Sequence, residues 1–285
     1  MAGKPIRRHE DLDLFARIFK VFADTPWLHY GLWLEGETPS MPKLREAQER
    51  YVDKLIARLP PAPASILDIG GGTGAMADRL ALLGYEVEML TPSEVQVEIA
   101  RETLGTRARV HQSRLEEFTS ERHFDVCLFS ESFQYVPMAQ SLPGVKVLLA
   151  DGGRVVIADC FRSEGYQGGR QVGGGHSFSE FLKAVDRHGF SITADEDVTA
   201  MAAPTIALDR RIYREVLSPL VSQFESTFAR RRPKLHWLAV RAYRLFVSKS
   251  ARNRIQRRLA AEQRTPEQFL TVNTYRFLTL VPRKG

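Results

Sequence analysis

A glycine-rich stretch at residues 65–74 constrains the fold of this chain more than any other feature. An apolar run with the sequence SILDI leads into the glycine cluster GGGTG, and AMADRL follows with helical spacing. This order predicts a β-strand, a tight turn and an α-helix. Glycines permit positive φ angles and a close approach to a ligand, and the N-terminus of a helix presents unpaired N–H groups. The stretch therefore predicts a nucleotide-binding turn.

Strand and helix patterns alternate along the chain that follows. We expect strands at 65–69, 85–90, 108–111, 124–129, 153–159, 190–194 and 273–281. We expect helices near 73–83, 93–103, 137–149 and 177–188. This alternation predicts an α/β fold with seven strands, mostly parallel, and helices on both faces of the sheet. Ligands of such sheets bind beyond the carboxyl ends of the strands, so the loops after residues 69, 90, 111 and 129 are expected to line one site.

Two further segments flank this alternation. The N-terminal segment combines an amphipathic helix at 10–23, an aromatic loop at 24–33 and a helix at about 43–59; the loop is either a lid or simple packing. Only helical patterns occur between 207 and about 270. The predicted organisation is N-terminal helices and a lid loop at 1–60, a nucleotide-binding domain at 61–206 plus 271–285, and a basic helical insertion at 207–270.

The charge of the chain is concentrated in that insertion. The net charge is +6, yet residues 229–261 carry eleven Lys/Arg and no acidic residue, so the remainder is mildly acidic. No apolar run reaches the length of a membrane span, and the first residues lack the apolar core of a signal peptide, so we expect a cytoplasmic protein. Cys127 and Cys160 lie in apolar strand patterns and are expected to be buried thiols, with no metal site.

The end of the second strand departs from the usual nucleotide-binding pattern. In most dinucleotide-binding domains this strand ends in an acidic residue that bonds a ribose diol, whereas Thr91 stands there in this chain. A hydroxyl can still bond the ribose, but the charged acceptor is missing. Taken alone, Thr91 weakens the case for a ligand with a ribose diol.

The motifs nevertheless resemble those of a known family. Asp68 two positions before Gly70, and the alternation of Gly70, Gly72 and Gly74, resemble motif I of the class I S-adenosylmethionine (SAM) methyltransferases. The segment LTPSEVQ at 90–96 resembles the I-T-L-S-P-x-Q pattern of the tocopherol, sterol and cyclopropane-fatty-acid methyltransferases. In that branch a threonine replaces the usual acid.

Two other stretches resemble the tocopherol-methyltransferase side of this branch. LHYGLW at 28–33 is similar to its N-terminal H-x-G-[FYW] loop. SESFQYVP at 130–137 is similar to its segment after the fourth strand, with Tyr135 where a histidine is common. The resemblance covers about residues 10–205 plus the final strand, and the basic insertion lies outside it.

The resemblance implies a Rossmann-like fold that binds SAM. Gly70, Gly72 and Gly74 would leave room for its methionine part, and Asp68 would organise the turn or contact the amino group. Thr91 and Gln96 would reach the ribose, although a helix cap is an alternative role for Thr91 and Ser93. The other residues implied for cofactor binding are Tyr30, Ser113, Leu115 and Ser130.

The reaction implied by this cofactor is an SN2 methyl transfer. Glu131 lies where a carboxylate could face the cofactor or the acceptor, as a base, a substrate-orienting group or a cofactor ligand. Tyr30, Tyr135 and His176 could close over the acceptor or stabilise the sulfonium through their rings, but each could equally serve packing or capping. Glu131, Tyr135 and His176 are therefore the candidate catalytic residues.

The basic insertion is the only sequence feature that bears on the acceptor. A largely apolar helix at 233–248, with Trp237 and Tyr243 flanked by cations, fits an anionic membrane surface and a lipophilic or aromatic small-molecule acceptor. A helical cap with a solvated basic face is the simpler alternative. RNA binding through Arg230–Arg232 and Arg252–Arg258, a polar metabolite as acceptor, and a non-catalytic SAM-binding subunit stay open.

Overall fold

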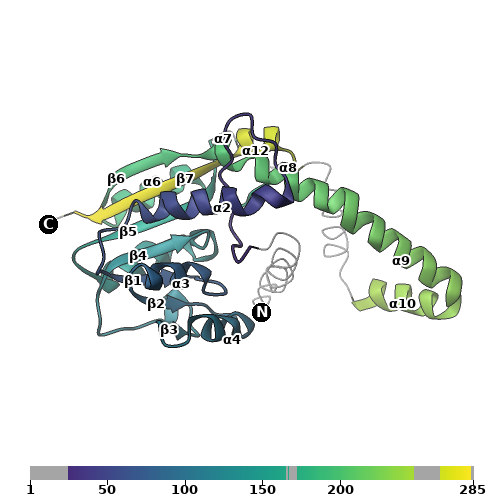
Figure 1. Ribbon diagram of the computed structural model, residues 1–285, viewed down its shortest axis with the longest axis horizontal. Coiled ribbons are helices and arrows are strands. Elements are labelled where there is room, and N and C mark those ends of the chain that lie inside the picture. The colour runs from purple at the N-terminus through teal and green to yellow at the C-terminus, as the bar shows by residue number, and fades with distance from the viewer. Residues whose placement is uncertain (1–24, 165, 167–171, 247–263, 284–285) are drawn as a thin grey trace.

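The protein is built around one seven-stranded sheet, seen in a computed structural model that describes residues 25–164, 166, 172–246 and 264–283 (Figure 1). The strands are β1 (Ser65–Ile69), β2 (Glu86–Leu90), β3 (Ala108–His111), β4 (Phe124–Ser130), β5 (Leu149–Arg162), β6 (Phe190–Asp197) and β7 (Asn273–Pro282). Their order is β3-β2-β1-β4-β5-β7-β6. Only β7 runs antiparallel to its neighbours, β5 and β6. The predicted α/β, Rossmann-like fold is confirmed.

Helices cover both faces because the inner strands are apolar on both sides. In β4, for example, Val126 and Leu128 pack on one face, and Cys127 and Phe129 pack on the other. The first face carries α2 (Met41–Ile56), α3 (Ala75–Leu82), α4 (Glu94–Leu104), α7 (Thr199–Ala202) and α12 (Pro266–Val272). The second carries α5 (Met138–Leu148) and α6 (Phe178–Arg187). Cys127 and Cys160 are buried free thiols, as predicted.

A long helical arm leaves the sheet after β6. It consists of α8 (Pro204–Arg211), a π-helical segment η3 (Ile212–Leu217), α9 (Ser218–Arg231) and α10 (Pro233–Phe246). Figure 1 shows the arm reaching away from the sheet, with α10 folded back beside α9. The boundary predicted at 206/207 falls inside α8, and α12, which the sequence assigns to the insertion, packs Phe269 into the core.

Some predicted features lie outside the described residues. These are the amphipathic helix at 10–23 and the basic run from Arg252 to Arg258. The side chains of residues 242–246, which include Tyr243, also lie outside them.

Candidate functional site

The glycine turn between β1 and α3 is the base of the site. Gly70, Gly72 and Gly74 have φ angles of 78°, 57° and 87°, which favour glycine. A Cβ added at Gly70 would lie 2.5 Å from Cβ of Ser132, and one at Gly74 would lie 3.2 Å from Cβ of Ala100. At Gly72 the nearest atom would be Leu28 Cδ1, at 3.9 Å. Gly70 and Gly74 therefore serve chain packing as well, whereas Gly72 faces open space suited to a ligand.

We expect Gly70→Ala to destabilise the fold more than Gly36→Ala does. Gly36 has nearly the same φ, 75°, but no atom lies within 4 Å of an added Cβ. Both variants carry the left-handed backbone cost of about 1–2 kcal/mol, while Gly70→Ala adds an overpacking cost of about 1–3 kcal/mol against Ser132. Urea denaturation measures both free energies of unfolding. Equal losses would show that the Ser132 contact does not constrain the turn.

Asp68 is an unpaired carboxyl buried beneath this turn. It is 1% exposed, and neither Oδ1 nor Oδ2 has a hydrogen-bond partner within the described structure. Burial raises its pKa to about 7. A Cβ at Gly71 would lie 2.5 Å from Asp68 Oδ2, so the second residue of the GGGTG turn also has to be glycine. Because an unpaired buried acceptor is costly, Asp68 fits a cationic or N–H-bearing ligand group.

The end of β2 holds Thr91 in a side-chain pair. Thr91 is buried, and its hydroxyl donates to Gln96 Oε1 at 2.7 Å. Ser93 caps α4 by accepting from the backbone N–H of Gln96 at 3.3 Å. The alternative capping role is thus correct for Ser93 and wrong for Thr91. Thr91 and Gln96 are brought together as the motif predicts, and their contact with a ribose stays a prediction.

The loop after β3 is less suggestive of a ligand site. Ser113 donates its hydroxyl to the carbonyl of Arg114 at 2.9 Å. Leu115, at the start of η1 (Leu115–Glu117), is buried in the core and lies beside Gly144 of α5. These local contacts explain both residues without a ligand, and their implied role in cofactor binding stays a prediction.

The aromatic loop before α2 is anchored over the glycine turn. Gln48 Nε2 donates to the carbonyl of His29 at 2.7 Å, and Thr205 Oγ1 accepts from Trp33 Nε1 at 2.9 Å. His29 stacks on Tyr51, with ring centroids 3.9 Å apart. Leu28 lies toward Gly72, as described above. The loop is thus packed firmly into the protein, and its role as a lid stays a prediction.

His29 is neutral in this environment. Its Nδ1 lies 2.9 Å from the carbonyl of Tyr30, so this nitrogen carries the proton. Nε2 is buried and has no partner within the described residues. Burial lowers the His29 pKa to about 4. His29 therefore presents a free acceptor, a role that the sequence analysis did not assign.

Glu131 follows β4 in a strained backbone conformation. Its φ is 54°, the only positive value among the described non-glycine residues. The backbone N–H of Tyr30 and the hydroxyl of Tyr275 both donate to its Oε1, each at 2.6 Å. Burial, with a smaller contribution from Asp159, raises the Glu131 pKa to about 8. Strain of this kind at a partly buried acid with a raised pKa is typical of functional sites.

Aromatic residues from three distant segments surround Glu131. Tyr275 is fully buried on β7, and Tyr30 stacks on Phe269 with ring centroids 5.8 Å apart. The hydroxyl of Tyr51 lies 3.0 Å from Ser130 Oγ, so Ser130 is held beside Glu131. The sequence analysis missed Tyr51 and Tyr275, because nothing in a helix or strand pattern shows that these tyrosines converge on the loop after β4.

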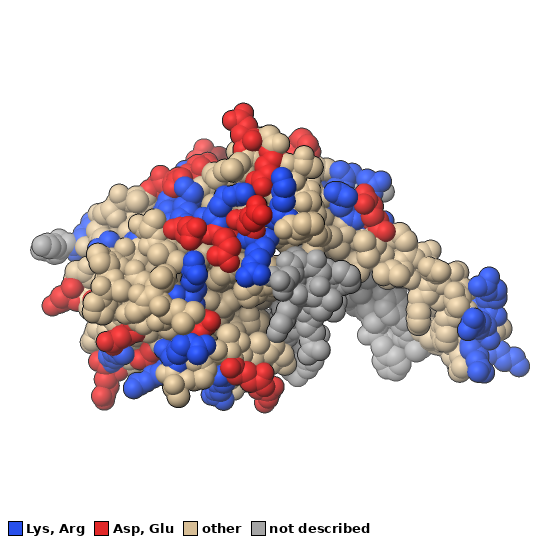
Figure 2. Space-filling view, in the orientation of Figure 1, with Lys and Arg blue, Asp and Glu red and all other residues tan. Residues whose placement is uncertain are grey.

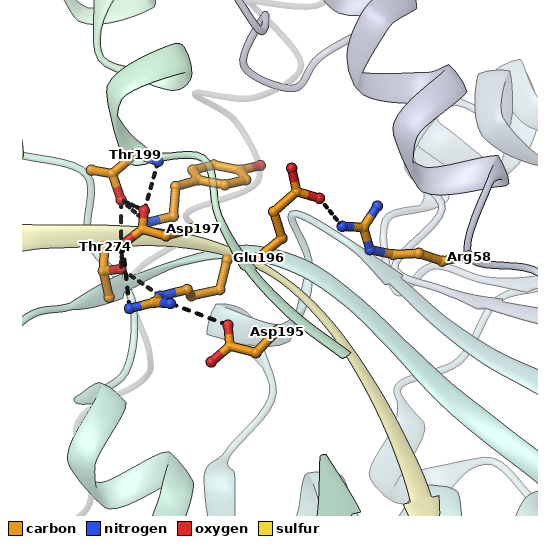
Figure 3. A network of polar contacts seen from close by, with 8 residues as sticks. Arg58, Asp195, Glu196, Asp197, Thr199 and Thr274 are labelled. Carbon is orange, nitrogen blue, oxygen red and sulfur yellow. Dashed lines mark hydrogen bonds and ion pairs between the residues drawn. The ribbon is translucent and has the colours of Figure 1, made fainter. Parts of the chain in front are cut away.

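A polar network fixes the start of β7, and with it Tyr275 (Figure 3). The hydroxyl of Thr199 accepts from the backbone N–H of Tyr275 at 2.8 Å, and it donates in turn to Asp197. Arg276 forms ion pairs with Asp195 and Asp197 at 3.2 and 3.3 Å. Glu196 points the other way, toward Arg58 and Lys54 of the α2 region. The network holds Tyr275 rigidly against Glu131.

The other two candidate catalytic residues, His176 and Tyr135, belong to the segments around and after η2 (Phe133–Tyr135). The Nε2–H of His176 donates to the carbonyl of Val136 at 2.9 Å, and its ring packs edge-on against Phe133. Tyr135 is 46% exposed on η2. His176 is therefore held locally by one hydrogen bond and one ring contact, and the catalytic roles of Tyr135 and His176 stay predictions.

Asp159 is a further buried acid that the sequence analysis missed. Its carboxylate accepts from the backbone N–H and the side-chain amide of Gln134, each at 3.0 Å. Burial raises its pKa to about 7. Because its oxygens are occupied, Asp159 shapes the loop after β4, whereas Asp68 and Glu131 retain capacity to bind a ligand.

Comparison with known proteins identifies the family. A family model described as a methyltransferase domain matches residues 44–195, more than half of the chain. An uncharacterized methyltransferase of Mycobacterium tuberculosis is 27% identical over 115 residues, 40% of this chain and 47% of that protein. A ubiquinone biosynthesis O-methyltransferase of Xanthomonas axonopodis pv. citri is 26% identical over 190 residues, 59% of this chain and 78% of that protein. The match spans about half the length of the mycobacterial relatives.

Solved structures share the fold across nearly the whole chain. A [4+2]-cyclase superimposes with a TM-score of 0.70 and 19% identity, covering 97% of this chain and 96% of its own. A geranyl diphosphate C-methyltransferase of Streptomyces coelicolor A3(2) gives 0.66 and 14%, covering 98% and 99%. A mycolic acid cyclopropane synthase gives 0.66 and 16%, covering 95% of each chain. Because one of these is a cyclase, the fold alone does not fix the reaction.

Proposed function

Because the chain belongs to the methyltransferase domain family, we propose that it transfers a methyl group from SAM to a small lipophilic or aromatic acceptor. The observation that carries this proposal is the placement of Glu131. Ser132, the next residue, packs against Gly70 of the glycine turn, and Tyr30 of the lid bonds Glu131 directly. A candidate base thus lies between the cofactor turn and the lid.

The residues of the turn fit SAM. The unpaired carboxyl of Asp68 suits the amino group of the methionine part, and the open space at Gly72 lets the backbone approach it. Thr91 and Gln96 would lie toward the ribose. When bound, SAM supplies a methyl group on a sulfonium, which is already activated toward a nucleophile.

The protein must then align the acceptor, exclude water and take up a proton. Glu131 is suited to receive the proton of an acceptor hydroxyl or acidic C–H, because its pKa of about 8 is close to neutral pH. Tyr275 and Tyr30 fix Oε1 by hydrogen bonds, which leaves Oε2 for the acceptor. The fixed carboxylate orients the proton transfer.

An apolar, aromatic acceptor is favoured by the walls of this site. Tyr30, Phe269 and Tyr275 present ring contacts around the carboxylate, with centroid distances of 5.6 and 5.8 Å from Tyr30. The cation Arg264 lies near Tyr30, and Asp209 pairs with it at 3.0 Å. Aromatic rings offer a large apolar surface, so the acceptor class that fits is lipophilic or aromatic.

We expect Tyr275→Phe to slow methyl transfer by about tenfold and to move the rising limb of the pH–rate profile to higher pH. The Tyr275 hydroxyl lowers the pKa of Glu131 by donating to its carboxylate, so its loss raises that pKa further. Steady-state rates from pH 6 to 10 measure both effects. Tyr85→Phe is the matched control, because the Tyr85 hydroxyl bonds Pro60 instead. A pH–rate profile without this shift would show that the Tyr275 hydroxyl does not set the pKa of the base.

The activity itself is tested by incubating the protein with methyl-labelled SAM, a whole lipid extract and, separately, an RNA fraction and a polar metabolite fraction. The proposal predicts label in the lipid or aromatic fraction. Label in RNA or in the polar fraction would show that the acceptor is RNA or a polar metabolite and not a lipophilic or aromatic compound. SAM binding without transfer to any fraction would favour a non-catalytic subunit.

A further inference from the structure

The helical arm exposes apolar side chains that no part of the described structure covers. None of the residues of α9 is buried. Phe224 is 73% exposed on α9, and Trp237 and Leu238 are 58% and 55% exposed on α10. Leu220, Val221 and Leu235 are exposed as well. Apolar side chains gathered on a projecting element mark an interaction surface.

One face of α10 combines these apolar groups with cations. Lys234, Trp237, Leu238 and Arg241 are spaced at i, i+3, i+4 and i+7, which places them on one side of the helix. The Arg241 guanidinium lies 5.1 Å from the centroid of the Trp237 ring. Pro233, Lys234, Trp237 and Leu238 also line one shallow depression. We call this face, Lys234, Trp237, Leu238 and Arg241, the α10 stripe.

The charge of α9 and α10 around the stripe is mostly positive. Residues 216–241 contain five Lys/Arg and a single acidic residue, Glu225. Figure 2 shows blue side chains gathered over the far end of α9 and α10. The partner of this surface should therefore be anionic and should accept apolar side chains.

We propose that the α10 stripe docks on an anionic lipid surface. Trp237 is suited to the boundary between headgroups and acyl chains, Leu238 to the acyl side, and Lys234 and Arg241 to lipid phosphates. RNA would satisfy the cations but would leave the exposed leucines and Phe224 in water. A second copy bound face to face would set five cations against five. No helix of the described residues is long and apolar enough to cross a membrane.

The test uses the intact protein and the fluorescence of its tryptophans. Trp27 and Trp33 are 5% and 1% exposed, so lipid-dependent changes report on Trp237. With vesicles containing 30% phosphatidylglycerol in brominated phosphatidylcholine, we expect quenching and a blue shift. Pure brominated phosphatidylcholine should bind at least about tenfold more weakly, and 0.5 M NaCl should release the protein.

Two variants and one control localise the contact by vesicle sedimentation. Lys234→Glu/Arg241→Glu and Trp237→Ser/Leu238→Ser should each weaken binding to anionic vesicles at least about tenfold. Leu82→Ser/Arg101→Glu removes an exposed apolar group and an exposed cation from α3 and α4, and should bind normally. The proposal would be overturned if the protein does not bind vesicles or if both stripe variants still bind them. It would also be overturned if RNA competes the vesicles off, or if the protein is a dimer that the stripe variants dissociate.

Discussion

A Glu131→Gln variant should transfer methyl groups about 10²–10⁴-fold more slowly than the wild type while keeping its fold and its affinity for SAM. The amide is nearly the same size and can still accept from Tyr30 and Tyr275 through its oxygen, but it cannot take up a proton. Single-turnover rates with a responsive acceptor measure the loss, and calorimetric titration with SAM measures the affinity. Glu180→Gln, at an exposed site on α6, is the matched control.

The pH dependence of the wild type gives an independent test of the same role. Burial holds the Glu131 pKa at about 8, so the base is mostly protonated and inactive at pH 6. The rate should rise with pH as the carboxylate forms, reach half its maximum near pH 8 and level off about one pH unit above that. A flat profile, or a Glu131→Gln variant with full turnover, would remove Glu131 from the reaction and leave it as a lid contact.

The second large effect concerns Asp68. Asp68→Asn should weaken SAM binding by about tenfold, because a hydrogen bond to a charged group is worth about 1.5–3 kcal/mol and a neutral one about 0.5–1.5 kcal/mol. Wild-type affinity should also fall below about pH 7, where Asp68 takes up a proton. Calorimetric titrations at pH 6 and 8 separate these effects. The SAM affinity of Asp68→Asn should not fall between pH 8 and pH 6 as the wild-type affinity does.

The same substitution should stabilise the protein without SAM at high pH. The pKa of Asp68 is raised from 3.8 to about 7 in the folded state, so the folded state binds the proton more tightly than the unfolded state. Its contribution to stability is therefore present at low pH and is lost as pH rises through about 7, up to about 4 kcal/mol. Asparagine carries no charge and avoids this loss.

A matched control shows whether the effects of Asp68→Asn come from a ligand group or from the loss of an acid that only stabilises the fold. Asp125, at the opposite end of the sheet, accepts from the backbone and hydroxyl of Ser65, each at 2.8 Å. Asp125→Asn should therefore destabilise the fold and leave SAM affinity unchanged. If Asp68→Asn behaves in the same way, Asp68 is a structural residue and not a ligand group.

Local sequence patterns were sufficient to predict the sheet and the cofactor turn. The strand, turn and helix at 65–80 are specified by residues that are adjacent in the sequence. Continuous apolar runs such as 124–129 predict strands that are buried on both faces. The expected strand at 153–159 is longer in the structure, Leu149–Arg162, because Leu149 pairs with Phe124 of β4 at one end and β7 pairs as far as Arg162 at the other. The predicted family follows from the same local motifs and is confirmed by the family match.

The surroundings of Glu131 could not be predicted in this way. Tyr275 is 144 residues away in sequence, and it reaches Glu131 only because β7 inserts antiparallel between β5 and β6. Tyr51 occupies an apolar position in a predicted helix, and nothing in that pattern shows that it reaches the loop after β4. The sequence likewise does not show that His176, a histidine in a glycine-rich loop, bonds the carbonyl of Val136. The contacts of these residues depend on packing between segments that are far apart in the sequence.

Calorimetric titration of the intact protein with SAM and, in parallel, with NAD tests the central claim most directly. The arrangement of Asp68, Gly72 and Thr91 predicts one SAM bound per chain, weakened by Asp68→Asn, and no response to NAD. Saturable NAD binding with no response to SAM would contradict the claim.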